Sequence, residues 1–278
     1  MKSLIKFSNC AALALLCSSL FLSSATHALS LEQKALELSV ELPVQGITLN
    51  YSQPVRLEQV LDDANANGAL GYFPLSAQLF DRNAQQQVDN LKAQVIEQLD
   101  LLAQQEPQIR SVIAQFESFD FQARYFVDLD RNAVISQPEK NPFLVSKDIP
   151  LSKGKVLESG KLNQAQRFDL YLTHRPTDLT LVGAVKQANK LKLIEHGQLD
   201  NYLSMLPECE LLETANKSTA FVIQPDGHVD EVSYAYWNRK QAYFAPGAIL
   251  FIAFDSLPSE FSTLNQNIIE LLRHKVNL

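Results

Sequence analysis

Apolar and polar residues alternate in two short segments near the start of the chain. Residues 36–42 and 47–51 follow this period of two, and Pro43 and Gly46 lie between them. Such alternation is typical of strands with one buried face, while proline and glycine favour a turn. The sequence therefore predicts a β-hairpin, followed by a helix over 56–64, where apolar residues have helical spacing.

A longer segment, residues 84–118, has the helical period. It is rich in Gln, Ala, Leu and Glu, and apolar residues recur every three to four positions on both sides of Pro107. This pattern predicts two helices joined at the proline, which form a helical hairpin. Residues 119–128 alternate again and predict a strand, and the turn-rich stretch 132–164 is expected to hold short strands around 143–145.

The second half of the chain contains the clearest strand patterns. Strands are predicted over the ranges 168–173, 179–185, 220–223 and 249–254. A helix is expected near 198–205, and Pro225, Asp226 and Gly227 predict a turn. The order strand, strand, helix, strand thus occurs once in each half, although no repeat of fixed period is present.

The C-terminal segment has the most regular helical pattern in the chain. An apolar stripe recurs there at intervals of four, three, four and three residues, at Leu257, Phe261, Leu264, Ile268 and Leu271. Polar residues occupy the opposite face, so the segment predicts an amphipathic helix that begins near Ser256. Such a stripe either packs on its own domain or docks on a partner protein or a membrane surface, and both alternatives stay open.

The first 28 residues have the pattern of a secretory signal peptide. Lys2 and Lys6 precede an apolar stretch over 11–22, which ends in small residues before Ala28. A retained anchor helix is the alternative, but the stretch is shorter than the roughly 18 to 20 apolar residues that span a bilayer. Neither cysteine of this segment has the position that lipidation requires, so we expect cleavage after Ala28.

Charge and cysteine content narrow the class of protein further. The chain has a formal net charge of −7, and cleavage of the signal would remove two of its lysines. An acidic chain does not bind nucleic acid through general phosphate neutralisation and is weakly attracted to anionic lipid. Of three cysteines only Cys209 lies beyond the signal, so an intramolecular disulfide is excluded. Cys209 is either a half-buried apolar residue or an exposed thiol.

Motifs for metal binding and catalysis are incomplete. Asp128, Asp130, Asn132 and Glu139 have the spacing of calcium ligands, but Ala133 stands where such a loop needs glycine. The histidines at 174, 196, 228 and 274 lack the close spacing of a metal site. No nucleophile elbow or phosphate-binding loop occurs. We therefore expect no metal, no cofactor and no catalytic residues, although distant carboxylates can still meet in space.

Two features are candidates for ligand binding. Arg124 is an isolated cation in an aromatic and apolar strand pattern. If it points inward, its guanidinium must pair with a carboxylate or carbonyl, or line a pocket for an anionic or hydroxyl-rich ligand. Trp237, together with Tyr234, Tyr236 and Tyr243, forms either a sugar-stacking platform or part of the core.

Several segments of the second half, in order, resemble the GfcC-like family of capsule polysaccharide biosynthesis proteins. They are residues 175–185, 222–227, 236–239 and 246–254, and the similarity continues through 257–276 and more weakly back to the first hairpin. The resemblance implies an α+β protein of two β-grasp domains, ubiquitin-like and of the soluble-ligand-binding (SLBB) type found in outer-membrane polysaccharide exporters. The first domain would cover 29–167 with the helical hairpin inserted at about 84–118, the second 168–255, and the C-terminal helix 256–278.

The resemblance also assigns residues. Arg124 matches the family's arginine after the helical hairpin, and Pro225, Asp226 and Gly227 match the hairpin of the second domain. Trp237, Asn238 and Arg239 match the segment that follows. Ala123 stands where relatives often have glycine, so a pocket beside Arg124 is expected to differ in shape. We expect ligand contacts at Arg124, Trp237 and Arg239, and partner contacts along the stripe from Leu257 to Leu271.

The expected function follows from these points. The chain would be a monomeric, non-enzymatic periplasmic accessory protein in capsule or O-antigen polysaccharide assembly or export, and would bind the glycan, an outer-membrane exporter, or both. One alternative is a glycan-modifying enzyme whose carboxylates gather near Arg124. Another is an assembly adaptor that acts through its C-terminal helix, with Arg124 in a structural role.

Overall fold

The computed structural model describes residues 38–125, 134, 136–137, 140–145, 165–207, 210–238 and 240–276. The chain divides into residues 1–35 and 36–278, and all described residues lie in the second of these units. Four sequence predictions lie outside the described residues. They are the signal peptide, the calcium-type loop, Cys209 and Arg239.

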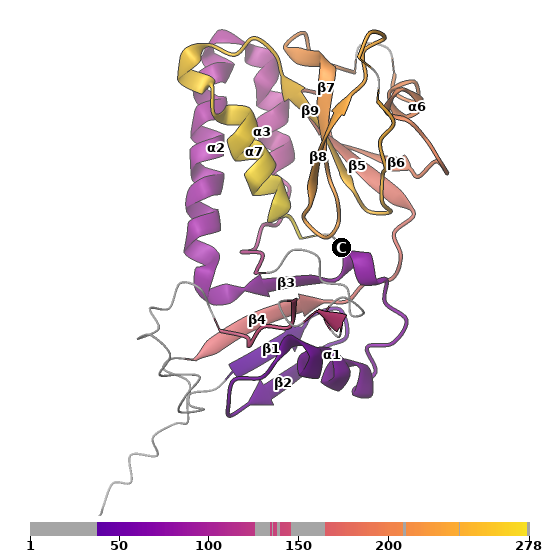
Figure 1. Ribbon diagram of the computed structural model, residues 1–278. Helices are drawn as coiled ribbons and strands as arrows, with labels where there is room; N and C mark the ends of the chain where they lie inside the picture. Colours follow the sequence, from indigo (N-terminus) through magenta and orange to yellow (C-terminus); the bar gives the residue numbers. More distant parts are fainter. Residues whose placement is uncertain are drawn as a thin grey trace, which may run out of the picture. The chain divides into compact units, whose positions relative to one another are not determined.

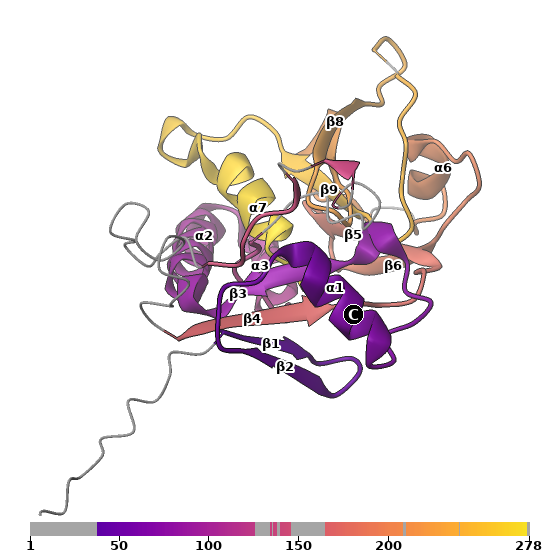
Figure 2. The same ribbon diagram turned by 60° about the horizontal axis from the view of Figure 1, so that its bottom comes forward.

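The first sheet has four strands in the order β2-β1-β4-β3 (Figure 1). These strands are β1 (Leu38–Leu42), β2 (Ile47–Tyr51), β3 (Gln78–Asp81) and β4 (Gln166–Tyr171). β4 pairs parallel to β1 and antiparallel to β3, so it lies in the middle of the sheet. The helix α1 (Leu57–Ala66) packs against one face of the sheet (Figure 2), where its apolar residues join those of β1 and β4 in one core.

The opposite face of the first sheet is polar. Side chains alternate along a strand, so Leu38, Val40 and Leu42 point toward α1 and Glu41 points away. The register pairs Glu41 of β1 with Asp169 of β4 and Asp169 with Phe80 of β3. This second face therefore carries charged and aromatic residues side by side.

The second sheet has five strands in the order β6-β5-β9-β7-β8. These are β5 (Asp178–Gly183), β6 (Asn189–Lys192), β7 (Ala215–Ile223), β8 (Val229–Ser233) and β9 (Ile249–Phe254), and the helix α6 (Leu199–Leu203) precedes β7. Every residue of the central strand β9 is buried. β5 and β9 are parallel and the other pairs are antiparallel. The sheet thus repeats the order of the first one and adds β8 at the edge.

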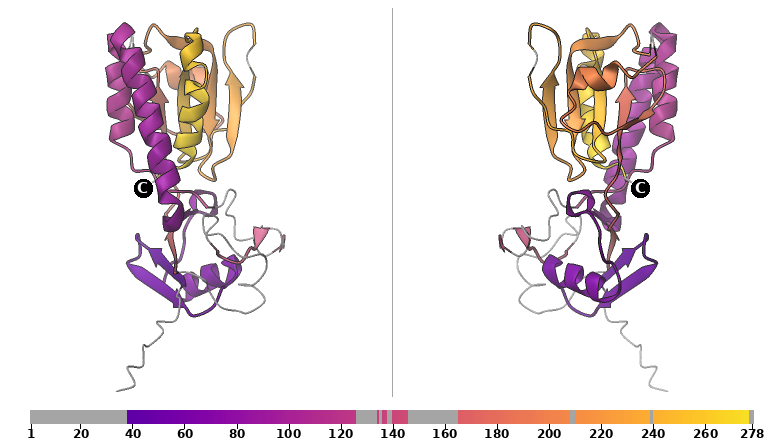
Figure 3. Two further views of the ribbon diagram at one scale, coloured as in Figure 1. Left: turned by 90° about the vertical axis from the view of Figure 1, so that its left-hand side faces the viewer. Right: turned by 90° about the vertical axis from the view of Figure 1, so that its right-hand side faces the viewer.

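Three helices pack against the second sheet (Figures 1 and 3). The helical hairpin consists of α2 (Gln85–Gln105), the short turn η3 (Pro107–Ile109) and α3 (Arg110–Glu117), and α7 spans Leu264–Arg273. Leu99 of α2, Phe116 of α3 and Ile268 of α7 share one core with Phe251 of β9. The helical hairpin therefore follows β3 of the first sheet in sequence, but its apolar face packs in the core of the second sheet. Within the described ranges no helix has the length and apolar character needed to span a membrane.

Several sequence predictions are confirmed. The fold is α+β with two sheets, and the helical hairpin and the amphipathic C-terminal helix are present. Two details differ. The boundary expected between 167 and 168 falls inside β4, because this strand completes the first sheet. In its described part, the strand predicted over 119–128 is reduced to two isolated bridges. Phe121 pairs with Lys275 and Arg124 pairs with Phe80, so the segment has no single partner strand along its length.

Candidate functional site around Arg124

Arg124 lies on an extended segment beside the edge strand of the first sheet. It forms an isolated antiparallel bridge with Phe80 of β3. Two main-chain hydrogen bonds fix this pairing, from the N–H of Asp81 to Ala123 and from the N–H of Tyr125 to Leu79, each 2.8 Å long. The backbone on both sides of Arg124 is therefore tied to β3.

Main-chain carbonyls from the second half of the chain hold the guanidinium. Nε donates to the carbonyl of Arg273 at 2.6 Å, and Nη1 donates to that of Pro225 at 3.2 Å. The group also lies 5.6 Å from the centre of the Phe80 ring. The Arg124 site thus joins β3, the turn before β8 and the end of α7.

Gly227 explains how the turn approaches so closely. Its φ of +91° belongs to the region that favours glycine. A Cβ added there would lie 3.1 Å from Cδ of Arg124 and 3.3 Å from its Nε. Arg273 fixes the same turn by donating from Nε to the carbonyl of Gly227 at 3.1 Å. The predicted turn at 225–227 therefore forms one wall around Arg124.

The charge of Arg124 is not neutralised by an ion pair. In the described part of the chain no carboxylate lies within 4.0 Å of it. Burial lowers the pKa of Arg124 to about 10, an effect that the charge of Asp226 opposes and that of Arg273 strengthens. The guanidinium is still charged at neutral pH, and carbonyls supply only partial negative charge. An anionic or hydroxyl-rich group would therefore be a favourable additional partner.

His274 and Glu270 complete the surroundings of Arg124. Nδ1 of His274 accepts the main-chain N–H of Arg124 at 2.9 Å, so the proton of a neutral imidazole sits on Nε2. Nε2 lies 3.6 Å from Glu270, whose other oxygen accepts from Arg273 at 2.7 Å. The hydrogen bond from His274 and the contact with Arg273 lower the pKa of Glu270 to about 2. Glu270 therefore remains charged and orients His274.

A cavity of about 310 Å³ opens beside these groups. Its polar lining includes Arg124, Tyr125, His274 and the carboxylates of Asp81 and Glu270, and apolar residues of α2 line the other side. This volume lies at the lower end of the range typical of small-ligand sites. The cavity can hold one small polar group such as a sugar substituent.

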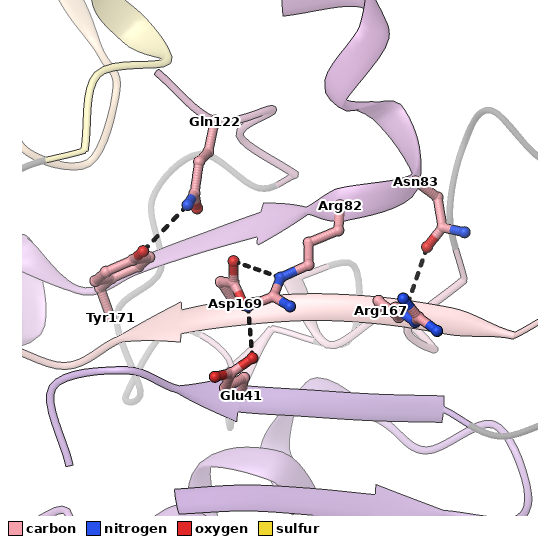
Figure 4. Close-up of polar contacts among 7 residues, drawn as sticks. All are labelled: Glu41, Arg82, Asn83, Gln122, Arg167, Asp169 and Tyr171. Atoms are coloured by element: carbon pink, nitrogen blue, oxygen red, sulfur yellow. Dashed lines mark hydrogen bonds and ion pairs between the residues drawn. The ribbon is translucent and has the colours of Figure 1, made fainter. Parts of the chain in front are cut away.

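A second polar cluster occupies the polar face of the first sheet (Figure 4). Arg82 contacts Glu41 at 2.5 Å and Asp169 at 2.6 Å, and Gln122 donates to the Tyr171 hydroxyl at 3.1 Å. The hydrogen bond from Arg82 to Asp169 raises the pKa of Arg82. This cluster is not predicted from the sequence. A signal was present, since Asp169 is an ionisable residue inside the apolar pattern of β4.

The other predicted ligand contact, Trp237, lies away from Arg124. The turn at 225–227 precedes β8 and Trp237 follows it, so the two flank opposite ends of this strand. Trp237 is 78% exposed and Tyr236 95% exposed, whereas the Tyr234 hydroxyl donates to the carbonyl of Asn216. The predicted aromatic group is therefore split between surface and interior.

The apolar stripe of the C-terminal segment is covered by its own chain. Phe261, Leu264, Ile268 and Leu271 are buried, and Leu257 is partly buried against the same core. α7 contacts α2, β7 and β9. Of the two alternatives for this stripe, the structure has the one in which it packs on its own domain.

Comparison with known proteins gives matches to two family models and to curated relatives. The family model for the N-terminal region of capsule biosynthesis GfcC proteins matches residues 35–148, and the model for their C-terminal region matches 187–277. The uncharacterized protein YjbG of Escherichia coli (strain K12) is 29% identical over 124 residues. This match covers 44% of the chain and 49% of the relative, so it spans about half the length of that protein. Arg124 lies in the first matched region and its carbonyl partners in the second.

Proposed function

Because this chain belongs to the capsule biosynthesis GfcC family, which implies a role in capsule assembly, we propose that it is a non-enzymatic periplasmic accessory protein. It binds the surface polysaccharide, the outer-membrane export machinery, or both, during assembly or export. In this proposal the protein acts as a monomer, needs no cofactor, and reaches the periplasm by its cleaved signal peptide.

The arrangement of Arg124 carries the proposal. Its guanidinium borders a cavity, is held by the carbonyls of Arg273 and Pro225, and has no carboxylate partner in the described ranges. Sugars present hydroxyl oxygens, and acidic sugars present carboxylates, both of which accept hydrogen bonds from arginine. A charged donor of this kind is suited to binding a glycan rather than to transforming it.

The shared order of the two sheets supports two β-grasp domains. In each, a hairpin is followed by a helix, a strand antiparallel to the central strand, and the central strand itself, which is parallel to the first strand. We propose that each sheet with its helix is one SLBB-type domain, with the helical hairpin inserted in the first. Likeness to modules of polysaccharide exporters favours an exporter as the protein partner.

Complementation of a gene deletion tests the role of Arg124. Deletion should reduce the amount or change the chain length of surface polysaccharide, and the natural protein should restore both. Arg124→Gln should fail to restore them although it is folded and secreted. Arg110→Gln is the matched control, because Arg110 is exposed on α3. Full restoration by Arg124→Gln would assign Arg124 a structural role only.

Incubation of the purified protein with isolated surface polysaccharide tests the absence of catalysis. We expect the chain length and substituents of the polysaccharide to remain unchanged, as measured by gel filtration and NMR. Turnover that is lost in Glu270→Gln or Asp81→Asn, variants of the two carboxylates that line the cavity, would replace the proposal with a glycan-modifying enzyme.

A further inference from the structure

A second cavity, separate from the one beside Arg124, is lined mainly by positively charged and hydroxyl side chains. It has a volume of about 310 Å³ and lies among the connection between β4 and β5, the strands β5 and β6, and the C-terminal segment. Arg175, Lys190, Lys275 and His174 contribute basic groups, and Asp178 is the carboxylate in its lining. The cavity is therefore more basic than the acidic chain as a whole.

Two of its cations lack a carboxylate partner among the residues that the structure describes. In the described part of the protein neither Arg175 nor Lys190 has a carboxylate within 4.0 Å, while Asp178 accepts a hydrogen bond from the hydroxyl of Thr177 at 3.2 Å. The Arg175 guanidinium lies 5.4 Å from the centre of the Phe73 ring, which positions it without using its N–H donors. These donors stay available for an oxyanion.

Lys275, which also lines the cavity, is partly buried and is repelled by Lys190. Burial, together with repulsion by Lys190, lowers its pKa to about 8, and attraction by Asp120 opposes this effect. The desolvated ammonium group of Lys275 and that of Lys190 carry like charges and therefore destabilise each other. A bound anion between them would remove that repulsion, so the cavity favours an anionic ligand.

Arg175 also borders a larger cavity of about 770 Å³. Tyr243, which is 69% exposed, lines this larger cavity together with Gln198, Gln241 and His196. Exposed aromatic rings and neighbouring amides are suited to stacking and hydrogen bonding of sugar rings. The two cavities on either side of Arg175 offer room for more than one sugar unit.

We propose that these two cavities bind an acidic segment of a polysaccharide, with the oxyanion of one sugar held by Arg175 and Lys190 and a neighbouring sugar stacked on Tyr243. This inference rests on the proposed function in polysaccharide assembly or export. The hydroxyls of Thr173 and Thr180, which line the smaller cavity, supply partners for the hydroxyl groups of the same sugar. The oxyanion is a uronate carboxylate or a sugar phosphate, which share this chemistry.

The site is distinct from Arg124 but adjoins it. Pro225 lines the basic cavity with its ring, while its carbonyl accepts the hydrogen bond from Arg124. Substitutions at the two sites can therefore be compared in one protein.

Calorimetric titration of the purified protein tests the proposal. The probes are an oligogalacturonate, the same oligosaccharide with its carboxyl groups reduced to alcohols, and glucose 6-phosphate. We expect the oligogalacturonate or the sugar phosphate to bind, and the reduced oligosaccharide to bind at least about tenfold more weakly, because it lacks the charge-assisted hydrogen bonds. Affinity should fall as salt is raised.

Matched variants assign the binding to this cavity. The double variant Arg175→Gln, Lys190→Gln should weaken binding of the acidic probe by about tenfold or more, and Tyr243→Ala should weaken binding of the oligosaccharide but not of glucose 6-phosphate. Lys186→Gln is the control, because Lys186 is exposed nearby and does not line either cavity. Unchanged affinity in the double variant would overturn the inference.

The outcome can be separated from that of the proposed function. If Arg124→Gln fails in complementation while the double variant binds acidic probes normally, the inference fails and the proposed function stands. If deletion of the gene leaves surface polysaccharide unchanged, the proposed function fails whatever the cavity binds. Equal binding of the acidic and reduced probes would also overturn the inference.

Discussion

Two arginines beside β3 have opposite surroundings. Arg82 follows the strand directly and contacts the carboxylates of Glu41 and Asp169, which raises its pKa. Arg124 pairs with the same strand, yet carbonyls hold it and burial lowers its pKa to about 10. Within the described residues, carboxylates neutralise the charge of Arg82, whereas carbonyls are the partners of Arg124.

This difference separates a structural charge from a charge that is available to a ligand. Asp169 is nearly inaccessible to solvent, so without Arg82 it would be a buried and unpaired carboxylate. Among the described residues Arg124 neutralises no buried carboxylate, and its desolvation opposes the stability of the folded state. We therefore expect the stability of the protein to depend more on Arg82 than on Arg124.

The largest expected effect comes from removing α7, which supplies part of the Arg124 site but none of the Arg82 cluster. Truncation before Leu257 deletes seven side chains that are buried in the described part of the chain, among them Phe261, Leu264, Ile268 and Leu271. Each large apolar residue contributes about 2–5 kcal/mol, and together they exceed the typical total stability of about 5–15 kcal/mol.

Circular dichroism and thermal denaturation of the truncated chain should therefore show an unfolded second sheet. A chain that ends at Val276 is the control and should unfold at the same temperature as the natural protein. If the chain truncated before Leu257 stays folded but no longer binds a partner, the stripe is an interface rather than core.

The next largest effect is expected at the Arg82 cluster. Arg82→Ala leaves the buried Asp169 carboxylate without its arginine partner. This should lower the free energy of unfolding by about 2 kcal/mol. The loss is smaller than for a fully buried pair because Arg82 is half exposed. Chemical denaturation measures this change. Glu41→Gln is the matched control and should cost less than about 1 kcal/mol. Equal losses in both variants would refute the structural role of Arg82.

The sequence predicts the helices of the second core well. The apolar spacing on both sides of Pro107 and from Leu264 to Leu271 is local information, and a helix forms from local contacts. The same spacing does not reveal which sheet a helix covers. The family resemblance implies a hairpin inserted in the first domain, and the structure adds that Leu99 and Phe116 share a core with the strand β9.

Pairing between distant strands was harder to predict. The pattern of β4 shows which of its residues are apolar, but not that its neighbours are β1 and β3. The partner of Asp169 is likewise hidden, because Arg82 lies 87 residues away in the sequence. Arg124 was identified because a lone cation in an apolar strand needs a partner, whereas its partners are carbonyls, which no sequence pattern marks.

Substitution of Arg124 should have a smaller effect on stability than substitution of Arg82. Arg124→Met removes two hydrogen bonds to carbonyls but also removes the desolvation of a charged group, and the two effects oppose each other. The free energy of unfolding should change by less than about 1 kcal/mol in chemical denaturation. A loss as large as that of Arg82→Ala would place both arginines in structural roles and remove the contrast between them.

The smallest expected effect concerns the pH dependence of the Arg124 site. The pKa of Glu270 is lowered to about 2 by His274 and Arg273, so its folded-state value lies below that of the unfolded chain. Such a carboxylate contributes stability that is complete above about pH 4.5 and is lost as pH falls toward 2. Because the Glu270 side chain is 42% exposed, solvent screening should limit this contribution to about 1 kcal/mol.

Glu270→Gln should therefore lower stability at pH 6 by this small amount and converge with the natural protein near pH 2. Denaturation curves recorded from pH 6 to pH 2 measure the difference, and Glu97→Gln on the exposed face of α2 should show none. Since Glu270 also orients His274, whose Nδ1 accepts the main-chain N–H of Arg124, the same variant should weaken binding at the Arg124 site and leave the Arg82 cluster unaffected. A pH-independent difference would mean that Glu270 acts by packing rather than by its charge.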